Sequence, residues 1–214
     1  CSLEEMAGIN KIFIVACGTA YHAGIVGKYY LEQLARIPVE VDIASEFRYR
    51  SPLVDGNSLT IVISQSGETS DTLAALKEAK RLGSRTLAVT NVVGSSISRE
   101  ADQVVYTYAG PEIAVASTKA YTAQIATLAF LAKAVGEANG NEKAKAFDLV
   151  HELSLVAQSI ESTLSEKEVI DEKVAALLSE TRNAFYIGRG QDYYVAMEAS
   201  LKLKEISYIQ CEGF

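Results

Sequence analysis

Five short apolar segments of this chain alternate with segments of helical periodicity, and this alternation limits the possible folds more than any other feature. The apolar segments are Lys11–Ala16, Val39–Ile43, Leu59–Ile63, Thr86–Thr90 and Val104–Thr107. Between them, apolar residues recur at helical spacing, as in the helix expected over Asp71–Leu82. Apolar strands separated by helices are typical of a doubly wound parallel sheet with helices on both faces. We therefore expect an α/β fold.

The pattern of the chain changes after residue 141. The expected elements there are helices over 143–165 and 169–182, a strand over 184–187 and a helix over 194–209. The last strand, its glycine-containing turn and the last helix repeat the order in which the chain begins. We expect three parts: a first domain at 8–140, a helical connection at 141–182 and the truncated start of a second domain at 183–214. One strand and one helix cannot complete a sheet, so we expect the chain to be part of a longer protein or to need another chain.

Composition and charge exclude several classes of partner. The chain has 214 residues, is 49% hydrophobic and carries a formal net charge of −7. Its longest apolar runs are far shorter than a membrane span, and no signal-peptide pattern is apparent. Its Lys and Arg residues form no cluster, which argues against nucleic acid and anionic membranes. We expect neither a nucleic-acid nor a membrane partner.

The few cysteines and histidines argue against a metal centre and a disulfide framework. The cysteines are Cys1, Cys17 and Cys211, and the histidines are His22 and His151. An odd number of widely spaced cysteines fits neither paired disulfides nor zinc ligands. We expect no metal, no cofactor and a reducing, cytoplasmic location.

The segment Ser64–Thr69 lies where an apolar strand is expected to turn into a helix, and it contains three hydroxyl side chains, an amide and a glycine. Backbone N–H groups at a helix start are unpaired and carry the positive end of the helix dipole, which suits a phosphate. Ser, Gly and Thr also form ordinary turns, so the segment alone leaves both interpretations open. The loops Cys17–Thr19 and Ala116–Thr118 also bring hydroxyls to strand ends, and this favours phosphate binding.

Lys202 and Glu205 lie three residues apart on the last expected helix and therefore share one face. A carboxylate acts as a base beside a carbonyl, and an ammonium stabilises the negative charge that develops on oxygen. A solvated Lys/Glu face is the alternative, and the spacing alone favours it. The role of Cys17 is also left open, because a thiol at a helix start is either a nucleophile or a small buried side chain.

Taken together, these segments resemble the isomerase half of the glucosamine-6-phosphate synthases, the glutamine–fructose-6-phosphate aminotransferase family, which contains two sugar-isomerase (SIS) domains. The resemblance rests on Cys17–His22, Ser45–Arg50, Ser64–Thr69 with Asp71–Leu73, Val115–Ala120 and Lys202–Ile209. These segments follow the family's order over nearly the whole chain. The serine-rich loop is shared by many SIS proteins, whereas its combination with Lys202–Ile209 is much more specific to this family.

The resemblance implies a flavodoxin-like, three-layer αβα SIS domain with a mostly five-stranded parallel sheet, followed by the start of a second SIS domain. It implies a sugar-phosphate site formed by Cys17, Gly18, Thr19, Ser64, Gln65, Ser66, Thr69, Val115 and Ser117. It also implies that Glu205 is the base that moves a proton between the first two sugar carbons, and that Lys202 assists it.

The resemblance further implies a reaction that makes glucosamine 6-phosphate from fructose 6-phosphate and glutamine-derived ammonia. It implies a glutaminase domain in the full-length parent and a homodimer formed through the isomerase half. Ala20 stands where serine is common, which removes one hydroxyl contact. The family's ring-opening histidine and Schiff-base lysine have no match here, so we expect the chain by itself to be catalytically incomplete.

Two other functions remain open. A non-catalytic SIS sensor would bind a sugar phosphate through the serine-rich loop without using Glu205. A fructosamine-phosphate deglycase would run similar chemistry toward ammonia release. Activity of the full-length parent separates these functions from amino-sugar synthesis.

Overall fold

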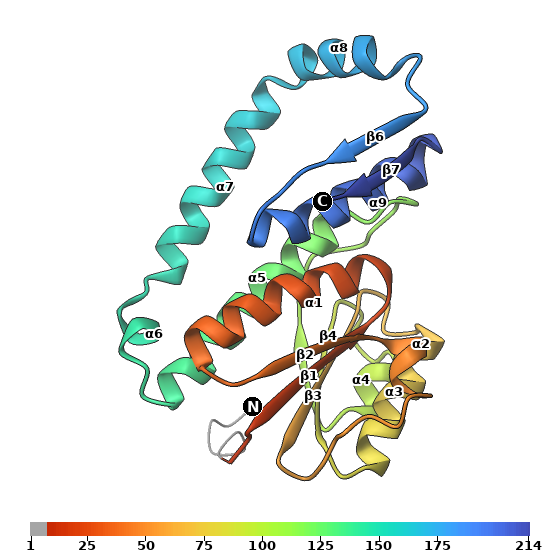
Figure 1. Cartoon of the computed structure of the whole chain (residues 1–214). Coiled ribbons are helices and arrows are strands. Elements are labelled where there is room, and N and C mark those ends of the chain that lie inside the picture. The colour runs from red at the N-terminus through yellow and green to blue at the C-terminus, as the bar shows by residue number, and fades with distance from the viewer. Residues whose placement is uncertain (1–7) are drawn as a thin grey trace. The chain divides into compact units, whose positions relative to one another are not determined.

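The computed structural model of the chain describes residues 8–214 and separates them into two compact units, one ending at Lys145 and one comprising Ala146–Phe214 (Figure 1). Cys1 lies outside the described residues. The first unit contains β1 (Lys11–Ala16), α1 (Gly18–Tyr30), a π-helical turn (Leu31–Ala35), β2 (Val39–Ile43), α2 (Ala44–Phe47), β3 (Ser58–Ser64), α3 (Ser70–Arg81), β4 (Arg85–Thr90), α4 (Ser96–Glu100), β5 (Gln103–Tyr106) and α5 (Lys119–Ala138). The short helix α6 (Glu142–Ala146) follows at the junction of the units.

The first unit is built on a parallel sheet. Within the described residues it has five strands in the order β2-β1-β3-β4-β5, and each neighbouring pair is parallel. This is the flavodoxin-like order, in which the chain starts near the middle of the sheet and winds outward in both directions. The expected α/β fold is therefore confirmed.

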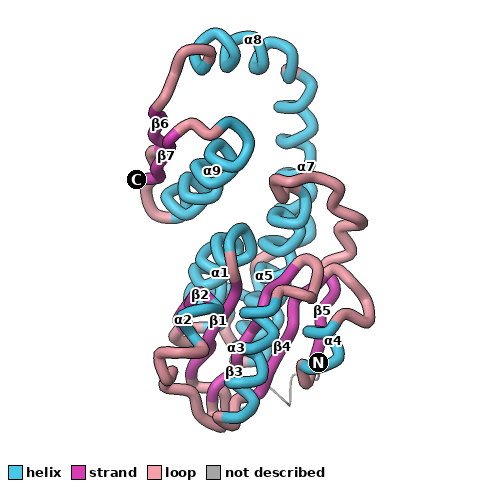
Figure 2. Tube along the Cα trace, turned by 90° about the vertical axis from the view of Figure 1, so that its right-hand side faces the viewer, coloured by secondary structure: helices cyan, strands magenta, loops and turns pink. Residues whose placement is uncertain are grey.

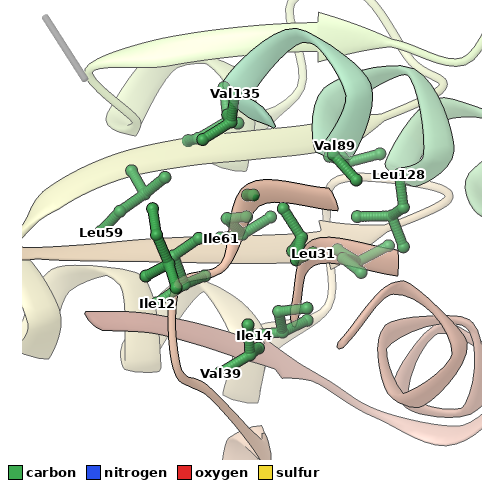
Figure 3. Packing of buried hydrophobic residues seen from close by; sticks show 14 of the residues in the cluster. Ile12, Ile14, Leu31, Val39, Leu59, Ile61, Val89, Leu128 and Val135 are labelled. Carbon is green, nitrogen blue, oxygen red and sulfur yellow. The ribbon is translucent and has the colours of Figure 1, made fainter. Parts of the chain in front are cut away.

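One face of the sheet packs against α1, the π-helical turn and α5. Successive side chains of a strand point to opposite faces, so Ile12 and Ile14 of β1 share this face. Figure 3 shows Leu31 of the turn and Leu128 of α5 packed into the same cluster. Both leucines are completely buried, and this burial fixes the two helical segments on the sheet.

The opposite face of the sheet packs against α2, α3 and α4. Phe13 of β1 points to this face, and its ring meets that of Phe47 edge-on at 6.0 Å between centroids. Leu76 of α3 and Ile97 of α4 are fully buried in the same cluster. Helices thus cover both faces, which gives the three αβα layers.

The second unit contains a small parallel sheet of its own. Its elements are α7 (Leu149–Ser165), α8 (Lys167–Leu178), β6 (Asn183–Tyr186), α9 (Gln191–Ser207) and β7 (Gln210–Gly213). The strands β6 and β7 pair in parallel, with Ala184 opposite Cys211, and lie side by side next to α9 (Figures 1 and 2). Strand, helix and parallel strand form one crossover unit. The sequence pattern predicts β6 and α9 but not β7.

The single helix expected over residues 143–165 is wrong, because the structure divides this stretch into α6 and α7. The carboxylate of Asp148 accepts a hydrogen bond from the backbone N–H of His151 at 3.1 Å. This N-cap satisfies a donor that has no partner at a helix start, so a new helix begins at Leu149.

The short helix α2 starts without a capping side chain. It begins at Ala44, and Ile43 occupies the cap position without a side-chain hydrogen bond. Ala44 and Phe47 are completely buried. Burial of these two side chains stabilises α2 in place of a capping hydroxyl.

Candidate functional site

A cavity of about 190 Å³ opens at the carboxyl edge of the sheet in the first unit. It is lined by Cys17, Thr19, Ala20, Ile63, Ser64, Gln65, Ser66, Thr69, Ser117 and Gln124. These residues come from Cys17 and the start of α1, from the end of β3 and the loop after it, from the segment before α5 and from α5 itself. The volume is far larger than the roughly 10–15 Å³ that a single water requires in this measure.

The topology of the sheet explains why the cavity lies there. Val15 of β1 is paired with Val62 of β3. Cys17 and Ser64 each follow two residues later, so they lie at the same height at the carboxyl edge of the sheet. The chain then leaves β1 for α1 on one face and β3 for α3 on the other. Two neighbouring strands whose helices pass to opposite faces leave a crevice between their loops, and ligands of open α/β sheets bind there.

Hydrogen bonds within the segment Ser64–Thr69 fix its shape. The hydroxyls of Ser64 and Thr69 lie 2.9 Å apart, and the Ser64 hydroxyl also accepts from the backbone N–H of Gly67 at 3.0 Å. The Ser66 hydroxyl accepts from the N–H of Glu68 at 3.2 Å. The segment therefore forms a preorganised turn in front of α3.

Gly67 brings this turn against the start of α4. Its φ is +67°, and its carbonyl oxygen accepts from the N–H of Ile97 at 2.9 Å. A Cβ atom at this position would lie 2.0 Å from the Ser95 hydroxyl oxygen and 2.9 Å from that of Thr90. Only glycine fits the combination of left-handed backbone and close contact.

The cavity offers helix starts in place of charged side chains. Neither Cys17 at the start of α1 nor Thr69 at the start of α3 forms a side-chain cap hydrogen bond. The described residues that line the cavity include no Lys, Arg, Asp or Glu. Unpaired N–H groups and helix dipoles therefore provide the positive potential, which suits an anionic group flanked by hydroxyls.

The nearby carboxylates are held by other donors. Glu68 accepts from the backbone N–H of Ser96 at 2.8 Å, and the hydrogen bonds from Ser96 lower the pKa of Glu68. Glu112 accepts from the N–H of Ala120 at 2.9 Å and from the Ser117 hydroxyl at 3.3 Å, and so occupies the start of α5. Burial raises the pKa of Glu112, but these hydrogen bonds and those from Thr118 outweigh it and lower the pKa overall.

The structure brings together seven of the nine residues expected to bind a sugar phosphate. They line the cavity and are Cys17, Thr19, Ser64, Gln65, Ser66, Thr69 and Ser117. Gly18 lies between two lining residues and has a φ of +54°, which turns the chain into α1. Val115 is 94% exposed and does not line the cavity. The thiol of Cys17, considered above as a nucleophile, is half-buried and accepts from the Thr72 hydroxyl at 3.9 Å.

Sequence reasoning missed Gln124 of α5. Its side chain lines the cavity, is only 2% exposed, and its Oε1 atom has no hydrogen-bond partner within the described residues. The available signal was one amide within an otherwise alanine-rich, apolar stretch of the expected helix. The apolar lining residues Ile63 and Ala20 were also not predicted as parts of the site.

In the second unit, the expected Lys202 and Glu205 pair is formed on α9. The Nζ atom of Lys202 lies 2.7 Å from Oε2 of Glu205 and 3.4 Å from Oε1 of Glu198, one turn earlier on the helix. The side chain of Glu198 is 5% exposed, that of Lys202 18% and that of Glu205 34%. The carboxylate of Glu205 is thus accessible, while the buried carboxylate of Glu198 contacts the Lys202 ammonium as well.

Metal-binding clusters and membrane-spanning helices are both absent from the part of the chain that the structure describes. Among residues 8–214, no cluster of His, Cys, Asp or Glu side chains has the size and arrangement to bind a metal ion. No helix in the same residues is both long and apolar enough to span a membrane.

The parallel sheet of this order, with a hydroxyl-lined crevice at its switch point, defines an open α/β domain of the kind that binds small anionic ligands. The chain belongs to the SIS domain family, whose family model matches residues 5–134.

Relatives of known name are similar over most of this chain. It is 69% identical over 212 residues to the glutamine–fructose-6-phosphate aminotransferase (isomerizing) of Streptococcus pneumoniae strain R6. This match covers 99% of this chain and 35% of that protein. It is 65% identical over 205 residues to the protein of the same name from Streptococcus pyogenes serotype M1, with 96% and 34% covered. The chain thus spans about a third of the length of these curated relatives.

A solved structure is similar over the whole chain. The C-terminal domain of glucosamine-fructose-6-phosphate aminotransferase from Francisella tularensis superposes with a TM-score of 0.94 at 38% identity. The match covers 100% of this chain and 60% of that one.

Gly67 and Gly94 test how closely the Ser64–Thr69 turn packs. Both have positive φ, but a Cβ atom at Gly94 would have no neighbour within 4 Å. We expect Gly94→Ala to lower the free energy of unfolding by about 1–2 kcal/mol, the cost of left-handed backbone. Gly67→Ala should cost clearly more, because its methyl group also meets Ser95. Urea unfolding of the two variants measures the difference, and equal losses would contradict the close packing.

Proposed function

We propose that this chain is the sugar-phosphate-binding isomerase portion of a glutamine–fructose-6-phosphate aminotransferase. The full-length protein would make glucosamine 6-phosphate from fructose 6-phosphate and ammonia derived from glutamine. Two relatives, at 69% and 65% identity over nearly all of this chain, are named for this activity, and their names support this reaction.

The observation that carries the proposal is the cavity at the carboxyl edge of the first unit. It combines the uncapped starts of α1 and α3 with the hydroxyls of Ser64, Ser66 and Thr69. In the proposed complex, backbone N–H groups and these hydroxyls donate to the phosphate oxygens. Cys17, Thr19 and Ser117 line the remainder of the cavity, where the sugar would lie.

In the proposed reaction, the chemistry depends on Lys202 and Glu205. The carboxylate of Glu205 takes a proton from one of the first two sugar carbons and returns it to the other. The ammonium of Lys202 stabilises the negative charge that develops on the neighbouring oxygen. The ion pair at 2.7 Å and the second contact of Lys202 with buried Glu198 support these roles, because they fix the ammonium beside the base.

The first test is binding of fructose 6-phosphate by the chain, measured by isothermal titration calorimetry. The double variant Ser66→Ala with Thr69→Ala removes two hydroxyls that would contact a charged group. We expect affinity to fall roughly 100-fold or more, since each such hydrogen bond contributes about 1.5–3 kcal/mol.

The matched control is Ser162→Ala with Thr163→Ala, which removes two exposed hydroxyls from α7. It should bind as the unmodified chain does. Equal affinity of the two double variants would contradict the assignment of the phosphate to the Ser64–Thr69 turn.

The second test addresses the catalytic role in the full-length protein. Glu205→Gln retains the size of the side chain but removes the base, so amino-sugar formation should fall by about 10²–10⁴-fold while sugar-phosphate binding persists. Glu161→Gln, an exposed position on α7, is the control. Unchanged synthesis in Glu205→Gln would favour a sugar-phosphate sensor, and ammonia release without synthesis would favour a deglycase.

We also propose that the full-length protein contains a glutaminase domain, forms a homodimer and is cytoplasmic. Glutamine in the relatives' names is a source of ammonia only if a glutaminase hydrolyses its side-chain amide, and this chain spans about a third of the relatives' length. One face of α7 exposes Leu155, Val156, Ile160 and Leu164, which supports an interface with another chain. Sequencing upstream of Cys1 should identify the glutaminase, and sedimentation velocity should give a dimer. A lone full-length monomer would contradict the assembly.

A further inference from the structure

Gln124 has surroundings that packing alone does not explain. It lies on the buried stripe of α5 that also contains Ala120, Leu128 and Ala132. An apolar side chain would complete this stripe, but Gln124 places an amide there with only 2% of its surface exposed. Burying an amide without a hydrogen-bond partner costs about 1–3 kcal/mol.

Gln124 is one of the residues that line the cavity described above, and within the described residues its buried Oε1 atom has no donor. Native proteins satisfy most buried polar side-chain atoms, so an exception inside a binding cavity points to a partner supplied by a ligand.

The chemistry of the unsatisfied atom restricts that partner. An amide oxygen accepts hydrogen bonds, so the partner must be a donor. The dianion of a phosphate monoester has acceptor oxygens only and cannot provide one. A sugar hydroxyl can, and the amide N–H₂ group can in turn donate to a neighbouring sugar oxygen.

We propose that Gln124 is a specificity-determining residue that accepts a hydrogen bond from a hydroxyl of the sugar and so recognises the carbohydrate part of the ligand. This inference rests on the proposed sugar-phosphate site. The Ser64–Thr69 turn then binds the phosphate, and Gln124 distinguishes a polyhydroxylated ligand from a plain phosphate. Sites that bind a substrate hydroxyl in this way reject analogues that lack it.

The experiment compares two ligands and two variants of the full chain by calorimetry. The ligands are fructose 6-phosphate and inorganic phosphate, the latter measured by competition with the former. The variants are Gln124→Met, which keeps the length of the side chain but not its polarity, and Gln158→Met, an exposed control on α7. We expect Gln124→Met to lower the affinity for fructose 6-phosphate about 3- to 10-fold and to leave the affinity for inorganic phosphate unchanged. Gln158→Met should change neither.

The outcomes separate this inference from the proposed function. If the unmodified chain does not bind fructose 6-phosphate, the proposed function fails. If it binds and Gln124→Met binds equally well, the role of Gln124 alone is wrong. An equal loss of affinity for both ligands would indicate that the amide contacts the phosphate and would overturn its assignment to the sugar.

Thermal unfolding without ligand distinguishes recognition from a structural role. Gln124→Met should melt at the same temperature as the unmodified chain or higher, because it removes an unsatisfied buried amide. A lower melting temperature with unchanged affinity would show that Gln124 stabilises the core and does not bind the ligand.

A crystal structure of the unmodified chain with fructose 6-phosphate gives a direct second measurement. A sugar oxygen within about 3.2 Å of Oε1 would support the inference, and a longer distance would overturn it.

Discussion

The parallel pairing of β1 with β3 is the constraint on which the first unit depends. The chain passes from β1 to α1 on one face and from β3 to α3 on the other, so the loops after these strands diverge. The pairing of Val15 with Val62 also sets the height at which each loop begins. The position of the cavity, and the lining residues that the ends of β1 and β3 contribute to it, follow from this one register.

The turn in front of α3 illustrates how neutral groups are organised for an anion. Its side-chain hydroxyls satisfy one another and its backbone, while Gly67 anchors it against α4. The unpaired N–H groups at the start of α3 stay available because Thr69 bonds to Ser64 and does not cap the helix. The second unit differs, because there α9 carries the charged side chains of Lys202 and Glu205 as an ion pair on one helical face.

The sequence predicts elements well where local periodicity and tertiary environment agree. The five apolar strands and the loops at their ends could be placed because parallel strands align their carboxyl ends at one edge. The strand β7 was missed because Gln210–Gly213 has no apolar alternation and is defined by its pairing with β6. Gln124 was missed because a polar residue in a helix is normally assigned to the solvent side, and only packing reveals its burial. The exposure of Val115 likewise depends on a loop path that no local pattern encodes.

The absence of carboxylates, amines and imidazoles from the described lining of the cavity has a consequence for how it would respond to acidity. Helix dipoles and hydroxyls keep the same charge throughout the range from weakly acidic to neutral solution. A phosphate monoester does not, because its second ionisation falls near pH 6. The lining of the cavity therefore acts as a fixed electrostatic template for the phosphate across this range, whereas the ligand's own charge changes with its titration.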